Sequence, residues 1–200
     1  MSSKAKVVKL KDVCTINAGR SLRGHIHKVD GTGVGLVQMR DMGSHSIDWN
    51  DCTSIELTGK AKPRFIEHGD TLLQTKGVNN EVAFVDASIN EAENSLVTAP
   101  YIFILRPHAD NKDILPEYLT WWLAQEPTQS YFKKQAKGEK SVSLTRPVVE
   151  HTAVVIPSIK KQKEIIKAHH EAIAAKKELE QLIIDQQAAA TAIAISLLEQ

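Results

Sequence analysis

The sequence lacks several features that would assign it to a broad class of proteins. Its 200 residues include two cysteines, Cys14 and Cys52, which are too few for a disulfide framework and are expected to be small, buried residues with free thiols. No signal peptide is recognisable, and no apolar run approaches the roughly 18 residues of a membrane span. We therefore expect a soluble, cytoplasmic protein with no membrane partner.

Neither sign of charge is in excess. The chain has 25 Lys and Arg residues against 24 Asp and Glu residues. The balance holds in both parts of the chain, because residues 1–158 carry 19 basic against 18 acidic side chains and residues 159–200 carry six of each. This composition excludes a globally basic protein, so any binding to nucleic acid must come from local patches.

Familiar catalytic motifs are also missing. The chain has no Asn-Pro-Pro-aromatic or Asp-Pro-Pro-aromatic tetrapeptide, with which an amino-methylase would hold a flipped base. It has no Walker lysine motif, no HExxH and no GxSxG. The glycines at 31, 33 and 35 lack GxGxxG spacing, and His25-x-His27 has no evident third metal ligand. We predict no cofactor, no metal and no catalytic residue, and the alternative of an unrecognised small enzyme has no nucleophile–base pair to support it.

Glycine and proline are absent from the last 43 residues. The segment 158–200 is rich in Ala, Glu, Gln, Lys and Leu, which are strong helix formers. Ser158 follows Pro157 and occupies the position of an N-cap. The pattern predicts one helix of about 40 residues, which would be about 60 Å long at 1.5 Å per residue.

Apolar residues recur along this predicted helix, mostly at spacings of three, four or seven, with many alanines between them. This spacing indicates a face that pairs with another long helix in a coiled-coil-like manner, although the helix could instead fold back on its own domain. The residues expected to form the dimer or partner face are Ile166, Ile173, Leu179, Leu182, Ile183, Ile193 and Leu197.

The first 157 residues are predicted to form a β-rich domain with helical insertions, which makes the fold class α+β. Alternating or β-branched stretches favour strands, and Pro116 with the apolar spacing that follows favours a helix, interrupted near Glu126–Pro127. The expected strands are 33–39, 71–75, 81–86, 95–107 (with 101–105 the most β-prone part) and 153–156. A short strand followed by a helical turn is expected within 7–19, and the expected helical region is 115–136.

Five segments, in this order, resemble one half of the specificity (S) subunit of a type I restriction–modification system. They are VVKLKDVCTINAGRS (7–21), VQMRDM (37–42), FIEHGDTLLQTKGVNNEVAFVD (65–86), LPEYLTWWLAQ (115–125) and AKGEKSVSLTRPVVEHTAVVIPSIKKQKEII (136–166). Asn79–Asn80 stand where the family has a second glycine. Family members carry two target-recognition domains and two long helices, so the resemblance implies a half-length form.

The resemblance places DNA recognition in polar loops of residues 1–157. Glutamine and asparagine suit adenine edges, lysine and arginine suit guanine edges, and clustered lysines suit phosphates. Tyr131 and Phe132, within the basic run, are expected to be core residues. The candidate DNA-binding residues are Arg20, Arg23, His25, Gln38, Arg40, Gln74, Thr75, Lys76, Asn79, Asn80, Lys133, Lys134, Lys137, Lys140, Ser143 and Arg146.

The function implied by the resemblance is non-catalytic recognition of double-stranded DNA. The helix at 158–200 would serve for dimerisation, spacing and docking of a DNA methyltransferase (M) subunit, and through it of a restriction (R) subunit. A homodimer would read a bipartite DNA site. The alternative is a regulatory or decoy half-subunit that joins a full-length specificity subunit without reading DNA itself.

Overall fold

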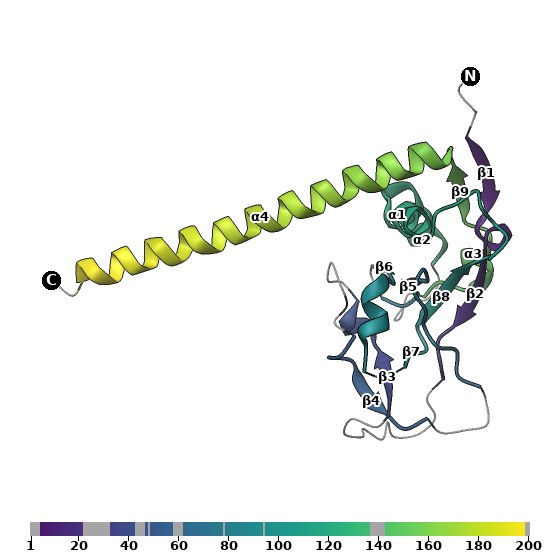
Figure 1. Ribbon diagram of the computed structural model, residues 1–200, viewed down its shortest axis with the longest axis horizontal. Coiled ribbons are helices and arrows are strands. Elements are labelled where there is room, and N and C mark those ends of the chain that lie inside the picture. The colour runs from purple at the N-terminus through teal and green to yellow at the C-terminus, as the bar shows by residue number, and fades with distance from the viewer. Residues whose placement is uncertain are drawn as a thin grey trace. The chain divides into compact units, whose positions relative to one another are not determined.

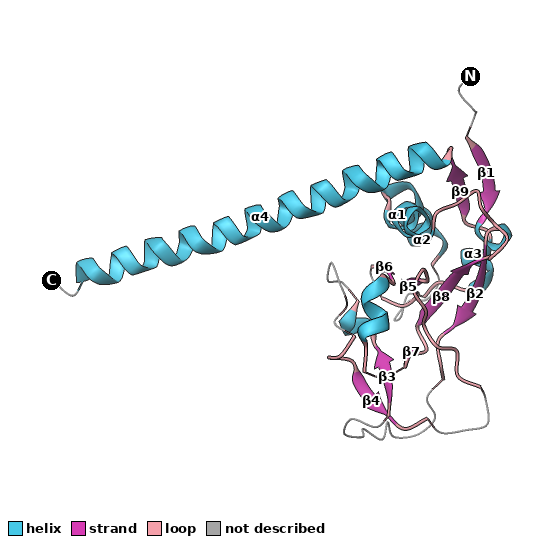
Figure 2. Cartoon of the chain, viewed as in Figure 1, coloured by secondary structure: helices cyan, strands magenta, loops and turns pink. Residues whose placement is uncertain are grey.

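The computed structural model describes residues 5–21, 33–42, 47, 49–57, 62–77, 79–93, 95–136 and 143–198. The chain divides into two compact units, residues 1–159 and 160–200. The sequence predicts the boundary between them after Pro157. The first unit mixes strands with short helices, and the second is a single helix (Figure 2). The α+β class and the long C-terminal helix are confirmed.

Nine strands in the described part of the first unit form three sheets. One sheet pairs β1 (Lys6–Lys9) with β9 (Ala153–Ile156), so the start and the end of the unit are joined. The second is antiparallel, in the order β2-β8-β5-β6 (Figure 1). The third has the order β4-β3-β7, with β3 and β7 parallel. The remaining strand bounds are Cys14–Ala18 (β2), Val34–Val37 (β3), Thr53–Ile55 (β4), Thr71–Gln74 (β5), Val82–Phe84 (β6), Leu96–Thr98 (β7) and Ile102–Pro107 (β8).

Short helices connect these strands. Three of them are 3-10 helices (η1, η2 and η3) and three are α-helices (α1, α2 and α3). Helices α1 and α2 follow one another where the sequence predicted a helix with a break. Pro116 and Pro127 each lie in a first turn, where proline loses no helical hydrogen bond. The bounds are η1 (Leu10–Asp12), η2 (Met39–Asp41), η3 (Ala87–Glu91), α1 (Pro116–Ala124), α2 (Glu126–Gln135) and α3 (Arg146–Glu150).

Helix α1 is fixed to β9 through two aromatic side chains one turn apart. The Tyr118 hydroxyl donates to the carbonyl of Val155 at 2.8 Å, and the Trp122 indole N–H donates to the carbonyl of Ala153 at 2.9 Å. Tyr118 is 1% exposed, and burial raises its pKa to about 12. These bonds use carbonyls on the side of β9 that β1 leaves open.

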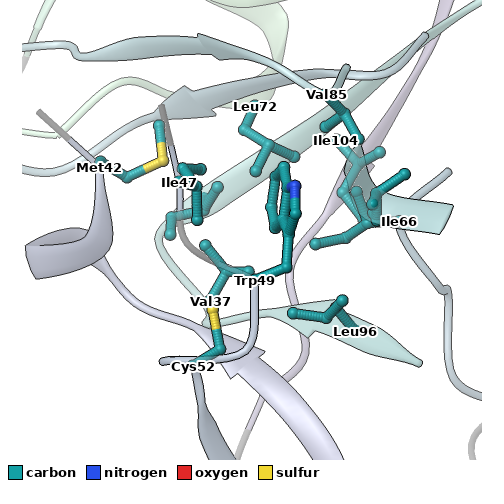
Figure 3. Packing of buried hydrophobic residues seen from close by; sticks show 12 residues of the cluster. Val37, Met42, Ile47, Trp49, Cys52, Ile66, Leu72, Val85, Leu96 and Ile104 are labelled. Atoms are coloured by element: carbon teal, nitrogen blue, oxygen red, sulfur yellow. The ribbon is translucent and has the colours of Figure 1, made fainter. Parts of the chain in front are cut away.

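The main apolar cluster lies between the two larger sheets. Trp49 lies among Ile66, Leu72, Leu96 and other buried side chains (Figure 3), and its indole N–H donates to the Ser88 hydroxyl at 2.8 Å. Burying large apolar side chains contributes roughly 1.5–3 kcal/mol each. Neither Cys14 nor Cys52 forms a disulfide and both are buried, as the sequence predicted.

A buried ion pair holds the turn before β5. Gly69 has φ of +90°, which favours glycine, and the next residue, Asp70, is 1% exposed. Its carboxylate accepts from Nε and Nη2 of Arg106, each at 2.8 Å, and from the backbone N–H of Glu67 at 2.9 Å. The Asp70 hydrogen bond raises the pKa of Arg106. The pair therefore joins the β5 turn to β8.

The second unit consists of nearly all of α4, which runs from Ile159 to Leu198. Ser158, the predicted N-cap, directly precedes the first residue of the helix. By length and composition α4 contains a stretch that could cross a membrane, with mean hydropathy 1.3. The sequence analysis did not predict this stretch, because Gln181, Asp185 and Gln186 interrupt its apolar run. Its many alanines and isoleucines nevertheless raise the mean hydropathy. One such helix is weak evidence for a membrane span.

Candidate nucleic-acid interface

The ends of several strands meet at one edge of the first unit. The backbone N–H of Arg20, just after β2, donates to the Thr98 carbonyl at the end of β7, at 2.8 Å. The N–H of Ala99 donates to the Val37 carbonyl at the end of β3, also at 2.8 Å. Segments distant in sequence are thus joined at this edge, which we call the strand-end edge and define by Gly19–Arg20, Val37–Arg40, Gln74–Lys76, Thr98–Tyr101 and Ser143.

Position 19 requires glycine, because the backbone there passes very close to the backbone of Ala99. A Cβ atom there would lie 1.9 Å from the carbonyl oxygen of Ala99. That is far inside van der Waals contact, and the obstacle is backbone, so it cannot rotate away. Gly19 therefore lets the chain after β2 pass against the β7–β8 turn and places Arg20, which is half-buried, beside it.

Lys76 is the best-defined cation of the strand-end edge. It forms an isolated antiparallel bridge with Ser143, and the N–H of Leu144 donates to the Thr75 carbonyl at 2.7 Å. The Lys76 ammonium nitrogen lies 4.2 Å from the ring centroid of Tyr101. Such cation–π contact is worth about 0.5–1 kcal/mol at an exposed site, so it favours one position of the lysine side chain.

Tyr101 was not among the sequence candidates. It lies in the turn between β7 and β8, is 46% exposed, and its carbonyl accepts from both the N–H and the hydroxyl of Thr75, at 2.8 and 3.0 Å. Sequence reasoning placed it within a strand. Pro100, directly before Tyr101, is a turn signal in the sequence that could have placed it in a turn instead.

Three of the predicted base-contacting residues instead support the Lys76 loop from within. Gln74, Thr75 and Asn80 are 8%, 3% and 5% exposed. The Gln74 amide donates to the Lys76 carbonyl at 2.8 Å, and the Asn80 amide donates to the Gln74 carbonyl at 3.0 Å. The side chains of this loop that are accessible to solvent are Lys76, which is half-buried, and Asn79, which is exposed.

Gln38 and Arg40 follow the end of β3, where the sequence also placed them. The Thr53 hydroxyl accepts from the Gln38 amide at 3.2 Å and from Nη2 of Arg40 at 2.8 Å. The Arg40 side chain is 63% exposed and is paired with Asp41 at 3.3 Å. Arg40 therefore presents a positioned guanidinium to solvent.

The predicted basic run does not form one continuous described surface. Lys133 and Lys134 are exposed in the last turn of α2, while Arg146 begins α3 and pairs with Glu150 at 2.7 Å. Phe132 is fully buried, which confirms it as a core residue, and Tyr131 is half-buried. Arg23, His25, Lys137 and Lys140 lie outside the described residues.

The predicted partner face of α4 is mostly accessible. Leu179, Leu182, Ile183, Ile193 and Leu197 are each 52–67% exposed. Ile173 is half-buried, and Ile166 is 9% exposed. The exposed leucines and isoleucines begin at Leu179, in the C-terminal half of the helix.

The described residues show little that would support catalysis. No three His, Cys, Asp or Glu side chains among them are grouped as a metal site requires. Burial raises the pKa of Cys14 to about 12, and its thiol donates to the Leu10 carbonyl at 3.4 Å, so it is a poor nucleophile at neutral pH.

Solved structures with a similar fold come from type I restriction–modification systems. A chain from a study of complex assembly and conformational transition of the type I R-M system matches with a TM-score of 0.63 and 17% identity, covering 87% of this chain and 40% of that chain. The HsdS subunit of Thermoanaerobacter tengcongensis matches with a TM-score of 0.60 and 17% identity, covering 86% and 38%. The type I S subunit of M. genitalium matches at 0.53 and 11%, covering 82% and 38%.

The matched class is therefore that of specificity subunits, and this chain spans about two fifths of the length of those structures. No curated protein matches the sequence. The family model for the type I restriction modification DNA specificity domain matches residues 2–187, so the chain belongs to that family. The resemblance inferred from the sequence is confirmed.

Proposed function

We propose that this chain is a non-catalytic subunit that recognises double-stranded DNA for a type I restriction–modification complex. Family membership supports a role in DNA specificity. The single observation that carries the proposal for this chain is the strand-end edge. Five separated segments that carry polar and cationic side chains meet there, although the unit as a whole has almost no net charge.

Within this edge the accessible side chains have the chemistry of a DNA interface. Lys76, Arg20 and Arg40 supply cations for phosphates or guanine edges, and the Asn79 amide can pair with adenine. Tyr101 adds an exposed ring whose partner cation is already in place. The Gln74 amide holds the Lys76 backbone and the Asn80 amide holds the Gln74 backbone, so Lys76 is already positioned, which lowers the entropy cost of binding. Lys133, Lys134 and Arg146 would contact phosphates.

The accessible apolar face of α4 supports the second part of the proposal. Two copies of the chain would pair through α4, and their two recognition units would read a bipartite DNA site. The paired helices would also dock methyltransferase subunits and, through them, a restriction subunit. A subunit that binds DNA in this way would act in the cytoplasm.

One observation favours a second candidate function. Residues 1–158 carry 19 basic against 18 acidic side chains, which is little net charge for a DNA-binding unit. A regulatory half-subunit would join a full-length specificity subunit through α4 and would not read DNA itself. This candidate requires the isolated chain to have no salt-sensitive affinity for DNA.

The test is the salt dependence of DNA binding by the full chain, measured by fluorescence anisotropy on random-sequence duplex and on a duplex of the sequence that the chain selects. The variant Lys76→Gln removes one cation of the strand-end edge. A phosphate contact would show as a slope of log affinity against log salt that is smaller by about one. A base contact would instead weaken binding to the preferred sequence alone.

The matched control is Lys112→Gln. Lys112 is exposed and follows the end of β8, whereas Tyr101 precedes its start, so the two lie beyond opposite ends of one strand. We expect this control to bind like the natural chain. Equal affinity, selectivity and slope for Lys76→Gln would remove the Lys76 loop from the interface. No binding of the natural chain at low salt would favour the regulatory candidate.

A further inference from the structure

Arg40, which follows β3, is held in one orientation by two contacts. Its Nε donates to a carboxylate oxygen of Asp41 at 3.3 Å, and its Nη2 donates to the Thr53 hydroxyl at 2.8 Å. Thr53 begins β4 and lies opposite Leu36 of β3, so the pairing of these two strands brings its hydroxyl to the arginine (Figure 1). The Arg40 side chain is nevertheless 63% exposed. The strand-end edge therefore presents an accessible guanidinium with a fixed direction.

The two residues that hold Arg40 are themselves fixed. Asp41 accepts from the backbone N–H of Gln38 at 2.8 Å through its other carboxylate oxygen, which caps the start of η2. The Thr53 hydroxyl accepts a second bond, from the Gln38 side-chain amide, at 3.2 Å. Both residues are half-buried, and the Asp41 side chain is only 17% exposed. Neither residue was a sequence candidate for the site.

The hydrogen bonds of the guanidinium leave its terminal nitrogens available to a ligand. Arginine has five N–H groups arranged as a planar fork. Asp41 uses the N–H of Nε and Thr53 uses one of the two on Nη2. The remaining N–H of Nη2 and both of Nη1 have no acceptor in the part of the chain that the structure describes. Each terminal nitrogen thus retains an N–H, which is what a bidentate contact needs.

The charge around Arg40 favours an uncharged ligand over a phosphate. The Arg40–Asp41 pair has no net charge, and the Asp41 carboxylate would repel a phosphate that approached the same guanidinium. In the major groove, guanine presents two uncharged acceptors, N7 and O6, and a bidentate arginine is the commonest specific contact to them. Adenine, thymine and cytosine present no such pair of acceptors there.

We propose that Arg40 reads a guanine in the DNA site of this chain, and that Thr53 and Asp41 are positioning residues for its guanidinium. The inference rests on the DNA recognition proposed above and names the base that this part of the strand-end edge selects. Lys76 is less suited to the same role, because its single ammonium group lies over the Tyr101 ring and lacks the planar fork.

The experiment first selects DNA from random-sequence duplex with the full natural chain and with Arg40→Ala. We expect one guanine position of the natural site to accept any base in the variant. Affinities are then measured on two duplexes that differ at this base pair alone, because their ratio cancels effects common to all sequences. The natural chain should prefer guanine by about 5- to 150-fold, and the preference should fall to about one in the variant.

Two further comparisons test the proposed contacts. Replacing the guanine by 7-deazaguanine removes the N7 acceptor, and it should weaken binding by the natural chain but not by Arg40→Ala. Thr53→Val removes the acceptor for Arg40 with little change of shape and should lower the guanine preference by about twofold or more. Thr53→Ser keeps the hydroxyl and should retain the preference. A purely structural role of Thr53 would change stability in urea without changing the preference for one base.

The matched control is Arg64→Ala. Arg64 is exposed and lines a pocket with Arg106, near the end of β8, whereas the strand-end edge includes Tyr101 before the start of β8. We expect this control to select the natural site with the natural preference for guanine. Loss of that preference in Arg64→Ala as well would show that removing an arginine acts without regard to position, and would overturn the assignment.

Failure of this inference is distinguishable from failure of the proposed function. If the natural chain selects a sequence and Arg40→Ala selects the same one, DNA recognition stands and Arg40 is not a base reader. Equal weakening on every duplex would show a phosphate contact, and relaxation at a position other than guanine would refute the choice of base. An unchanged preference in Thr53→Val would refute the positioning role. If the natural chain selects no sequence, both the recognition and the inference fail.

Discussion

Removing the Asp70 carboxylate should destabilise the first unit more than any surface substitution. Asp70 is 1% exposed, accepts two hydrogen bonds from Arg106 at 2.8 Å, and accepts a third from the Glu67 N–H. The variant Asp70→Ala would leave that N–H and part of the guanidinium without their acceptor. Breaking a buried ion pair by removing one partner typically costs about 3–5 kcal/mol.

The expected cost here is smaller, because Arg106 keeps other partners. Its side chain is 37% exposed, pairs with Glu67 at 2.7 Å and donates to the Phe65 carbonyl at 2.9 Å. We therefore expect Asp70→Ala to lower the free energy of unfolding by about 2–3 kcal/mol, since solvent and Glu67 compensate part of the loss.

Urea unfolding followed by tryptophan fluorescence measures this change. Trp49, Trp121 and Trp122 all lie in the first unit, so the signal reports that unit and not α4. The control is Glu150→Ala, which removes the exposed ion pair with Arg146 and should cost about 0.5 kcal/mol or less. If Asp70→Ala unfolds within about 0.5 kcal/mol of this control, the Asp70–Arg106 pair does not hold the β5 turn.

Three further outcomes follow from individual side chains. Gly19→Ala should lower the free energy of unfolding by about 1–3 kcal/mol, because its Cβ would collide with the Ala99 carbonyl, and an unchanged urea midpoint would contradict that contact. The Cys14 thiol, with a pKa of about 12, should react with a disulfide reagent at pH 8 only after unfolding, and rapid reaction in the native state would contradict its burial. The pKa of Tyr118 is raised from 10.0 to about 12, so the stability that its neutral form contributes should be complete below pH 10 and lost as pH rises through 12. The variant Tyr118→Phe should lose less unfolding free energy than the natural chain as the pH rises through 12. If both proteins show the same dependence of unfolding free energy on pH, ionisation of Tyr118 does not contribute.

Local patterns in the sequence were sufficient to predict many elements. The lack of glycine and proline after Pro157 predicted α4, which ends one turn or less from the expected limits. Alternating or β-branched runs predicted β3, β5, β6, β8 and β9, and β9 has the predicted bounds 153–156. The single strand expected over 95–107 is wrong, because a turn divides it into β7 and β8. The predicted break near Glu126–Pro127 is confirmed, with Gln125 between α1 and α2.

Features that depend on distant pairs were not predictable in this way. The short strand β4 and the parallel pairing of β3 with β7 depend on register between separated segments. The Asp70–Arg106 pair joins residues 36 positions apart, and no local signal relates them. Fold-level sequence reasoning identifies which segments are strands, but not which of them become neighbours.

The candidate site shows the same division. Residue types and loop positions predicted the Gln74–Asn80 segment, and the structure brings its Lys76 together with Ser143. The sequence could not distinguish the buried Gln74 and Asn80 from the accessible Lys76 and Asn79, because all four are polar residues in one loop. Tyr101 was missed since its importance comes from the Lys76 ammonium that lies over its ring.

The most direct test of the central claim is selection of DNA by the full chain. Random-sequence duplex is incubated with the purified protein, and the retained DNA is sequenced after several rounds. The account predicts enrichment of two separated half-sites related by two-fold symmetry, with one fixed spacing between them. Retention of no sequence above the input pool would contradict the claim that this chain recognises DNA.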